Sequence, residues 1–284
     1  MIRVIESAEE MFSLVQQEKN EGKSIGFVPT MGALHTGHIS LAKRCSRNNM
    51  FSVVSIFVNP TQFNDIKDLE KYARNLPLDL EKLERSGIDV VFAPTVAEIY
   101  PDGQNEGAEI DLGGLDTFME GKFRPGHFKG MAQVVKRLLD IVTPDNLYMG
   151  QKDFQQFTIV DYMIKSLEIK TRLVVCPIIR EKNGLAMSSR NERLSSEARE
   201  KAKIIFKTLS LIKRYKSKKS PSELITYGLK KLNSGPFELE YLEIVDGYTL
   251  NSVSDFEQTK YAVVCVAVWV EGIRLIDNLN LYKN

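Results

Sequence analysis

The sequence predicts an α/β protein, in which a Rossmann-like, doubly wound parallel sheet is followed by a smaller C-terminal α+β domain with an antiparallel sheet. Three observations support this prediction. Apolar, β-branched runs alternate with amphipathic stretches over residues 1–178, which is the order of a parallel sheet with crossover helices. The last apolar runs are separated by turn residues and by no helical stretch, which favours antiparallel pairing. A chain of 284 residues can also bury a substantial core.

The first part of the chain supplies the expected parallel strands and their helices. The strand-like runs are nearly continuous in apolar residues, which is typical of strands covered on both faces. They are SIGFVPT (24–30), FSVVSIFVNP (51–60), IDVVFAPT (88–95) and TRLVVCPII (171–179). The amphipathic stretches that predict helices are residues 38–49, 68–87, 129–144 and 153–167. We therefore expect residues 1–178 to form one domain.

The character of the chain changes after residue 178. A charged turn at 180–184 precedes a helix that is expected to begin at Ser195 or Ser196, and a second helix follows the SPSE at 220–223. Three strand-like runs then follow at 239–246, 261–272 and 273–279. Residues 179–284 are therefore predicted to form the smaller domain. The basic run 213–220 is expected to be a solvated loop between helices.

Composition excludes some classes of partner. Lys plus Arg is 38 and Asp plus Glu is 37, so a net charge of +1 gives no reason to expect a nucleic acid or a membrane surface as partner. The sequence predicts no signal peptide and contains no apolar run of membrane-spanning length. Cys45, Cys176 and Cys265 are odd in number and far apart, so we expect buried core residues in a reducing, cytoplasmic setting.

The stretch PTMGALHTGH (29–38) follows a predicted strand and opens a helix. Ligands of parallel sheets bind where strands end and helices begin. Free amides and the positive end of the helix dipole favour a phosphate there, and His35 and His38 would add donors from one helix face. A metal site and purely structural histidines remain less favoured alternatives.

Three further stretches carry polar side chains at predicted loop or helix boundaries. SIFVNPTQFN (55–64) offers Asn59 and Gln62 for a neutral polar ligand, or only an Asn-Pro turn. LYMGQKDFQQFTIV (147–160) offers Lys152 for phosphate, while Asp153 also fits an ordinary N-cap. LAMSSRN (185–191) combines two hydroxyls with Arg190, which indicates either a phosphate clamp or a helix cap.

Two weaker candidates remain open. FRPGHFKG (123–130) places Arg124, His127 and Lys129 ahead of a helix, as a mobile cationic lid or as a capped turn. Asp79 is a candidate magnesium ligand, although a solvated acid on a helix face is the more common use of such a residue.

The combination of stretches resembles the pantoate-β-alanine ligase (pantothenate synthetase) family of the nucleotidylyl-transferase superfamily. The likeness rests on MGALHTGH, FVNPTQF, GQKDFQQ and MSSRN in this order, and it extends over the chain through RPGHF and RLIDN. The resemblance implies that ATP and pantoate give pantoyl adenylate and pyrophosphate, after which the amine of β-alanine displaces AMP. It also implies a homodimer.

The resemblance assigns roles residue by residue. Catalysis is expected from His38 as proton donor, with His35, Lys152 and Arg190. Pantoate is expected to contact Asn59, Gln62 and Gln156, and β-alanine to contact Gln62. The expected ATP contacts are Met31, Gly32, Ala33, Leu34, His35, Thr36, Gly37, His38, Gly150, Gln151, Lys152, Asp153, Ile179, Met187, Ser188, Ser189 and Arg190.

The implied domains are an ATP- and pantoate-binding domain over 1–178 and a lid domain over 179–284, with residues 64–74 as a second candidate lid. Mg²⁺ is expected on the phosphates of ATP, with Asp79 as its candidate protein ligand.

The sequence departs from the family pattern at two positions: Thr36 stands where relatives often carry an acid, and Ala73 stands where proline is expected. The alternatives are another adenylyl transferase of the same fold and a non-catalytic nucleotide-binding regulator.

Overall fold

A computed structural model gives the fold and describes residues 2–63, 69–70, 72–103, 109–233 and 235–282. Contacts divide the chain into two compact units, each of which is described by itself. The first unit comprises Met1–Gly150 and Ile159–Cys176, and the second comprises Gln151–Thr158 and Pro177–Asn284. The second unit begins close to the boundary expected after residue 178, and it also includes residues 151–158, which the sequence placed in the first domain.

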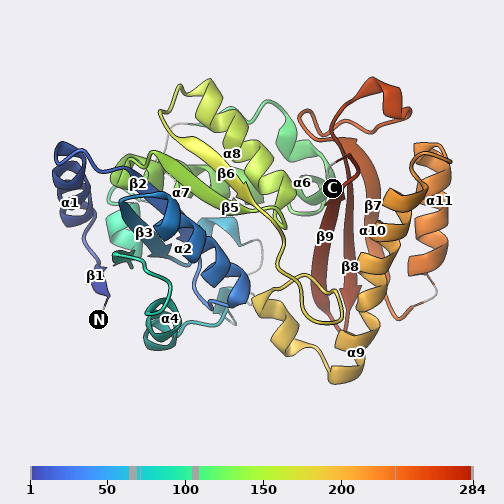
Figure 1. Ribbon diagram of the computed structural model, residues 1–284, viewed down its shortest axis with the longest axis horizontal. Helices are drawn as coiled ribbons and strands as arrows, with labels where there is room; N and C mark the ends of the chain where they lie inside the picture. The colour runs from blue at the N-terminus through green and yellow to red at the C-terminus, as the bar shows by residue number, and fades with distance from the viewer. Residues whose placement is uncertain (1, 64–68, 71, 104–108, 234, 283–284) are drawn as a thin grey trace. The chain divides into compact units, whose positions relative to one another are not determined.

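The first unit is built on a six-stranded parallel sheet, as the sequence predicted (Figure 1). The strand order is β1-β4-β3-β2-β5-β6. The central strands β2 and β3 are buried at nearly every position, so side chains on both faces are covered. The strands are β1 (Arg3–Ile5), β2 (Ile25–Thr30), β3 (Phe51–Ile56), β4 (Val90–Phe92), β5 (Asn146–Gly150) and β6 (Arg172–Cys176).

Two strands of this sheet were not predicted. Strand β1 has only three residues, too few to show a period. Strand β5 was interpreted only as an approach to a helix, yet it pairs with β2 through Gly26 opposite Asn146 and Phe27 opposite Leu147. From β2 the chain continues in one direction to β3 and β4, whereas β5 and β6 lie on the other side of β2. Such a reversal of strand order creates the crevice in which α/β proteins bind ligands.

Helices flank the parallel sheet. Helix α2 packs against β2, β3 and β5, while α1 and α7 pack against β2 and against each other. The α-helices are α1 (Ala8–Asn20), α2 (Thr36–Asn48), α4 (Leu76–Leu83), α5 (Val96–Ile99), α6 (Met119–Phe123), α7 (His127–Val142) and α8 (Phe154–Ser166). Two short 3-10 helices are η1 (Pro60–Gln62) and η2 (Leu115–Thr117).

The helix predicted over residues 68–87 is shorter than expected. Helix α4 begins at Leu76, because the side chain of Asn75 accepts a hydrogen bond from the amide of Leu78 at 3.1 Å and so caps the helix there. Pro77 lies in its first turn, where a proline costs no hydrogen bond. Most of the candidate lid at 64–74 lies outside the described residues.

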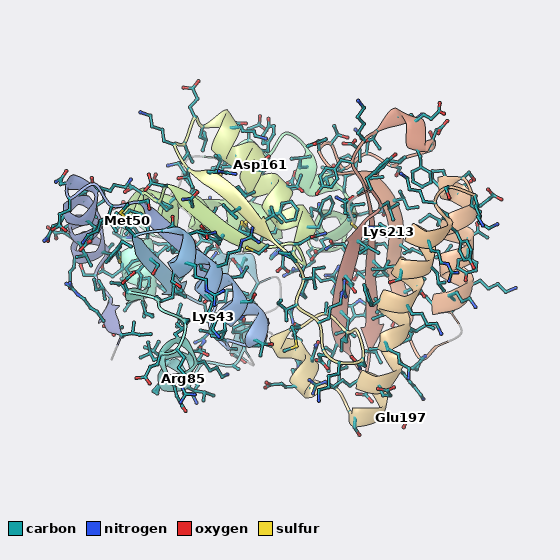
Figure 2. The ribbon with its side chains drawn as sticks, viewed as in Figure 1. Lys43, Met50, Arg85, Asp161, Glu197 and Lys213 are labelled. Carbon is teal, nitrogen blue, oxygen red and sulfur yellow. The ribbon has the colours of Figure 1, made fainter. Side chains whose placement is uncertain are left out.

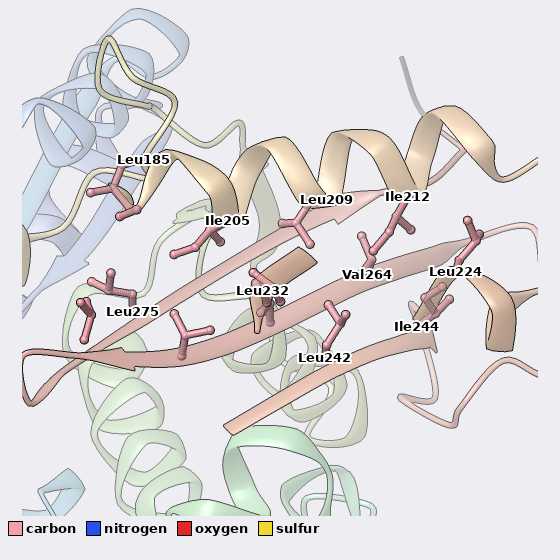
Figure 3. Packing of buried hydrophobic residues seen from close by; sticks show 14 of the residues in the cluster. Leu185, Ile205, Leu209, Ile212, Leu224, Leu232, Leu242, Ile244, Val264 and Leu275 are labelled. Atoms are coloured by element: carbon pink, nitrogen blue, oxygen red, sulfur yellow. The ribbon is translucent and has the colours of Figure 1, made fainter. Parts of the chain in front are cut away.

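The second unit contains the predicted antiparallel sheet, in the order β7-β8-β9. Its strands are β7 (Glu238–Asp246), β8 (Ala262–Val270) and β9 (Ile273–Asn280). Its helices are η3 (Ser189–Arg193), α9 (Ser196–Lys201), α10 (Lys203–Tyr215), α11 (Pro221–Leu232) and η4 (Phe256–Gln258). Figure 3 shows side chains of α10, among them Leu209 and Ile212, directed at the sheet to form one buried cluster with Val264 and Leu242.

Most charged side chains lie on the surface and the cysteines lie in the interior. Charged side chains such as Lys43, Arg85 and Glu197 are exposed (Figure 2). Cys45, Cys176 and Cys265 are free and buried, as expected. Among the helices that the structure describes, none is both long and apolar enough to cross a membrane.

Candidate functional site

The loop between β2 and α2 carries the two histidines and turns sharply. Gly32 has a φ of 78° and Ala33 a φ of 49°, so two successive residues are left-handed. For a residue with a side chain such as Ala33 this conformation costs about 1 to 3 kcal/mol and persists only where neighbouring contacts hold it. The hydroxyl of Thr30 contributes by accepting the amide of Gly32 at 3.2 Å and donating to the carbonyl of Ser55 at 2.7 Å.

The two imidazoles cap the start of α2 and stack on each other. Nδ1 of His35 accepts the amide of Gly37 at 3.1 Å, and Nδ1 of His38 accepts the amide of His35 at 3.4 Å. The ring centroids are 4.0 Å apart with an interplanar angle of 22°. A ring nitrogen that accepts a hydrogen bond carries no proton, so each neutral ring has its proton on Nε2. Both histidines are thereby set to offer an Nε2 donor.

The sequence predicted free backbone amides at this helix start, but in the structure four of them donate to side chains of the protein. The amides of Ala33 and Leu34 donate to the carboxylate of Asp79 at 2.9 and 2.7 Å. Those of His35 and Gly37 donate to the histidine rings. An anion at this position would therefore rely on side-chain donors rather than on these four amides.

Asn59 and Gln62, on the loop after β3, form a buried amide cluster. Asn59 is 1% exposed, donates to the carbonyl of Gly130 at 3.2 Å and accepts from the hydroxyl of Tyr100 at 2.9 Å. Burial raises the pKa of Tyr100, which keeps this hydroxyl protonated as the donor. Nε2 of Gln62 lies 2.6 Å from Sδ of Met31, so this cluster contacts the histidine loop. No pattern in the sequence pointed to Tyr100.

The RPGH segment is a packed turn at the start of α7. His127 is 7% exposed, and its Nδ1 lies 2.8 Å from the carbonyl oxygen of Gln62. Nη1 of Arg124 lies 3.1 Å from Nε2 of His127 and 3.4 Å from the carboxylate of Glu120. Of the two interpretations left open for this segment, the geometry favours the turn, and of its three candidate side chains only that of Lys129 is well exposed.

Asp79 is 2% exposed, so it is not a solvated acid on a helix face. Each of its oxygens accepts a backbone amide, which leaves the magnesium assignment without support from geometry and still a prediction. Over the described ranges, no group of three or more His, Cys, Asp or Glu residues could hold a metal ion. A magnesium ion held mainly by ATP phosphates would need no such group.

In the second unit, strand β9 holds the segment that contains Lys152. Nδ2 of Asn278 donates to the carbonyl oxygens of Gln151 and Lys152 at 2.8 and 2.9 Å. Nζ of Lys152 lies 3.4 Å from the carboxylate of Asp153. Asn278 is only 2% exposed and was not singled out from the sequence, although the adjacent polar residues Asp277 and Asn278 in the strand motif RLIDN are a signal that could have found it.

The hairpin at 179–191 brings together the predicted Ile179 and the Met187–Arg190 group. The amide of Met187 donates to the carbonyl of Ile179 at 2.9 Å, and Oγ of Ser188 accepts the amide of Arg190 at 3.3 Å. Arg180 binds the neighbouring Asp277 through two hydrogen bonds of 2.6 and 3.0 Å. Burial raises the pKa of the Asp277 carboxyl, and the guanidinium opposes that shift.

The predicted residues are thus divided into two sets, one in each unit. Gln156 lies half-buried on α8. The first unit holds Met31, Gly32, Ala33, Leu34, His35, Thr36, Gly37, His38, Asn59, Gln62, Asp79 and Gly150; the second holds Gln151, Lys152, Asp153, Gln156, Ile179, Met187, Ser188, Ser189 and Arg190.

Comparison with known proteins gives consistent matches over the whole chain. The family described as Pantoate-beta-alanine ligase matches residues 3–280. The pantothenate synthetase of Bacteroides thetaiotaomicron is 46% identical over 283 residues, covering 99% of each chain. The crystal structure of pantothenate synthetase from Thermus thermophilus is 39% identical with a TM-score of 0.92, covering 99% of this chain and 100% of that one. The Francisella tularensis pantoate-beta-alanine ligase, solved with beta-gamma ATP and beta-alanine, is 36% identical with a TM-score of 0.81, covering 100% of this chain and 99% of that one.

Proposed function

The chain belongs to the pantoate-β-alanine ligase family and is a ligase that uses ATP to join pantoate to β-alanine, and we propose that the two residue sets described above carry out this reaction. In the first step a carboxylate oxygen of pantoate attacks the α-phosphorus of ATP and pyrophosphate leaves. In the second step the amine of β-alanine attacks the carbonyl of pantoyl adenylate, AMP leaves and the amine nitrogen loses a proton.

The residue assignment rests on the two stacked imidazoles that cap the start of α2. Adenylation passes through an α-phosphorus that carries extra negative charge, so its catalysts should be hydrogen-bond donors and cations rather than nucleophiles. The Nε2 protons of His35 and His38 are suitable donors, because both Nδ1 atoms are engaged by amides. His38 is the proposed proton donor in this step.

The second unit contributes the cationic part of the proposed ATP-binding set. Lys152 and Arg190 neutralise phosphate charge, and Ser188 and Ser189 donate from their hydroxyls. Contacts of Asn278 with the carbonyls of Gln151 and Lys152 support this proposal, since they fix the backbone on which the lysine stands. The remaining ATP contacts proposed are Met31, Gly32, Ala33, Leu34, Thr36, Gly37, Gly150, Gln151, Asp153, Ile179 and Met187.

Asn59, Gln62 and Gln156 are the proposed pantoate contacts, and Gln62 also serves β-alanine. Amide side chains both donate and accept, as the hydroxyl and carboxylate groups of pantoate require. The contact of Gln62 with Met31 on the histidine loop supports the assignment of Gln62, and Asn59 donates to the side chain of Gln62 at 3.3 Å. Mg²⁺ bound to the phosphates would supply further positive charge to the leaving pyrophosphate.

Exchange of labelled pyrophosphate into ATP tests the proposal, measured with pantoate, with amino acids and with no added acid. We expect exchange only with pantoate, and formation of pantothenate when β-alanine is added. Exchange at a rate that does not depend on pantoate would instead indicate an adenylyl transferase with another acceptor. Absence of both exchange and product formation would indicate a nucleotide-binding regulator.

A cytoplasmic homodimer and a covering lid complete the proposal. The acyl adenylate is prone to hydrolysis, so closure by residues 64–74 or by the C-terminal domain would protect it. Limited proteolysis with and without pantoate plus ATP tests the lid, and unchanged cleavage in both regions would contradict it. Sedimentation should give about twice the chain mass of 32.2 kDa, and a mass of one chain would contradict the dimer.

A further inference from the structure

Two side chains of helix α4 form hydrogen bonds with the backbone of the histidine loop. The carboxylate of Asp79 accepts the amides of Ala33 and Leu34 at 2.9 and 2.7 Å. Lys82, on the same helix, donates from Nζ to the carbonyl oxygen of Leu34 at 2.7 Å. Residues three apart lie on one face of a helix. Asp79 and Lys82 can therefore bind the amide and the carbonyl of Leu34 at the same time. His35 follows directly.

The carboxylate occupies a place that the loop has shaped for an anion. Successive backbone amides in a turn can form a concave anion-binding nest. Gly32 and Ala33 have φ values of 78° and 49°, and Asp79 in the nest is only 2% exposed. A Cβ added to Gly32 would lie 3.1 Å from Oδ2 of Asp79, so the loop is closely fitted to this carboxylate. The protein's own anion, rather than a substrate phosphate, fills the nest.

We propose that Asp79 and Lys82 are positioning residues for His35 and His38 in the adenylation step. They act through the backbone of the loop, which fixes where the two Nε2 donors stand, and Asp79 is not a magnesium ligand. The inference rests on the proposed role of the histidines. It is tested with pyrophosphate exchange, for which wild-type protein must first show dependence on pantoate; a wild-type failure would count against the proposed function and not against this inference.

The first variant is Asp79→Asn. Asparagine keeps one acceptor oxygen but turns an NH2 group toward a backbone amide, which leaves a buried donor unsatisfied. We expect exchange to slow by about tenfold to a hundredfold while circular dichroism shows a folded protein. Glu81→Gln is the matched control, because it makes the same change at an exposed position of α4 and should exchange at the wild-type rate.

A double-mutant cycle separates positioning from general destabilisation. If Asp79 acts through the two histidines, then Asp79→Asn should slow exchange by less than about threefold in a background that carries both His35→Asn and His38→Asn. If the combined variant instead slowed exchange by the product of the separate fold-changes, the inference would be overturned. The Mg²⁺ concentration that gives half-maximal exchange should be the same in Asp79→Asn and in wild type. A shift of more than about threefold would identify Asp79 as a metal ligand and overturn the inference as well.

Lys82 provides an independent test that does not depend on Asp79→Asn folding. Lys82→Met removes the donor to Leu34 but keeps an apolar stem, so exchange should fall by about tenfold. Lys82→Arg restores a donor and should recover most of that loss. Wild-type exchange in folded Lys82→Met would contradict the inference.

Discussion

At the residue scale, the same hydrogen bonds that cap α2 also select the tautomer of its histidines. Nδ1 of each ring accepts a backbone amide, and Nε2 carries the proton that the proposed adenylation step would use. The structural role and the proposed chemical role therefore fall on different atoms of one side chain. This division lets the two roles be separated by substitutions that replace one nitrogen at a time.

Substitution of His38 by asparagine should strongly slow catalysis and preserve the helix start. Asparagine places an acceptor oxygen as far from the backbone as Nδ1, so it can still accept the amide of His35, but it has nothing at the position of Nε2. We expect pyrophosphate exchange to fall by at least about a hundredfold, with the melting temperature close to that of wild type.

His38→Gln is the matched variant, since its amide nitrogen stands at about the position of Nε2 while the cap is lost. It should melt at a lower temperature than His38→Asn but exchange faster. Folded His38→Asn with wild-type exchange would contradict the role assigned to Nε2.

The cysteines give a prediction that depends on pH. Burial raises the pKa of Cys45 to about 12 and also raises that of Cys176. The thiolate is the reactive form, so raising the pH from 7 to 9 should not increase labelling of native protein as it would for an ordinary thiol. Labelling with a thiol reagent in buffer should be slow at both pH values and should reach three thiols in urea. Rapid labelling of native Cys45 would contradict this.

At the scale of elements, the amide cluster depends on the close approach of α7 to η1. Asn59 donates to the carbonyl oxygen of Gly130 on α7. A Cβ added to Gly130 would lie 2.4 Å from the carbonyl oxygen of Thr61, a distance that backbone atoms cannot accommodate without shifting. The absence of a side chain at Gly130 therefore sets the position of Asn59 and Gln62.

Gly130→Ala should consequently weaken pantoate binding more than ATP binding. We expect the KM for pantoate to rise by about tenfold or more, because the amide groups lose their alignment, and the KM for ATP to change by less than about twofold. Steady-state kinetics with each substrate varied in turn measures both. Asp140→Ala, at an exposed position of the same helix, is the control, and an equal rise in both KM values would argue against the assignment.

The elements themselves were predictable where their signals are local. Strands β2, β3, β4 and β6 show continuous apolar runs, and β7, β8 and β9 follow one another with only the short 3-10 helix η4 between β7 and β8. The helix expected over 68–87 was too long, because the capping by Asn75 was not recognised. Strand β5 was missed because a short run that ends in glycine shows no clear period, and its identity depends on pairing with β2 and β6.

At the scale of the whole chain, residues far apart in sequence hold the candidate catalytic groups within the second unit. Asn278 and the carbonyl of Gln151 are separated by 127 positions, and Asp277 and Arg180 by 97. The C-terminal strand β9 thus supports both the Lys152 segment and the hairpin that carries Arg190. Neither contact leaves a periodic signal in the sequence.

Asn278→Asp should impair ATP use without a large change in shape. Aspartate matches asparagine in size but has no N–H donor, and its oxygens would face the carbonyls of Gln151 and Lys152. We expect exchange to slow by about tenfold to a hundredfold and the KM for ATP to rise. Asn251→Asp makes the same change at an exposed residue and should leave both unchanged. Wild-type exchange in folded Asn278→Asp would contradict the supporting role of β9.

The sequence by itself determined the fold class, the family and the identity of most candidate site residues, because strand and helix periods are local and the four motifs lie in short contiguous stretches. The tertiary structure decided how those residues are held. It showed that Asp79 is buried against the histidine loop, that the loop amides are already engaged, and that Tyr100, Gly130 and Asn278 form hydrogen bonds with candidate site residues. These contacts join segments that are distant in sequence, and such pairing is specified only once the chain is packed.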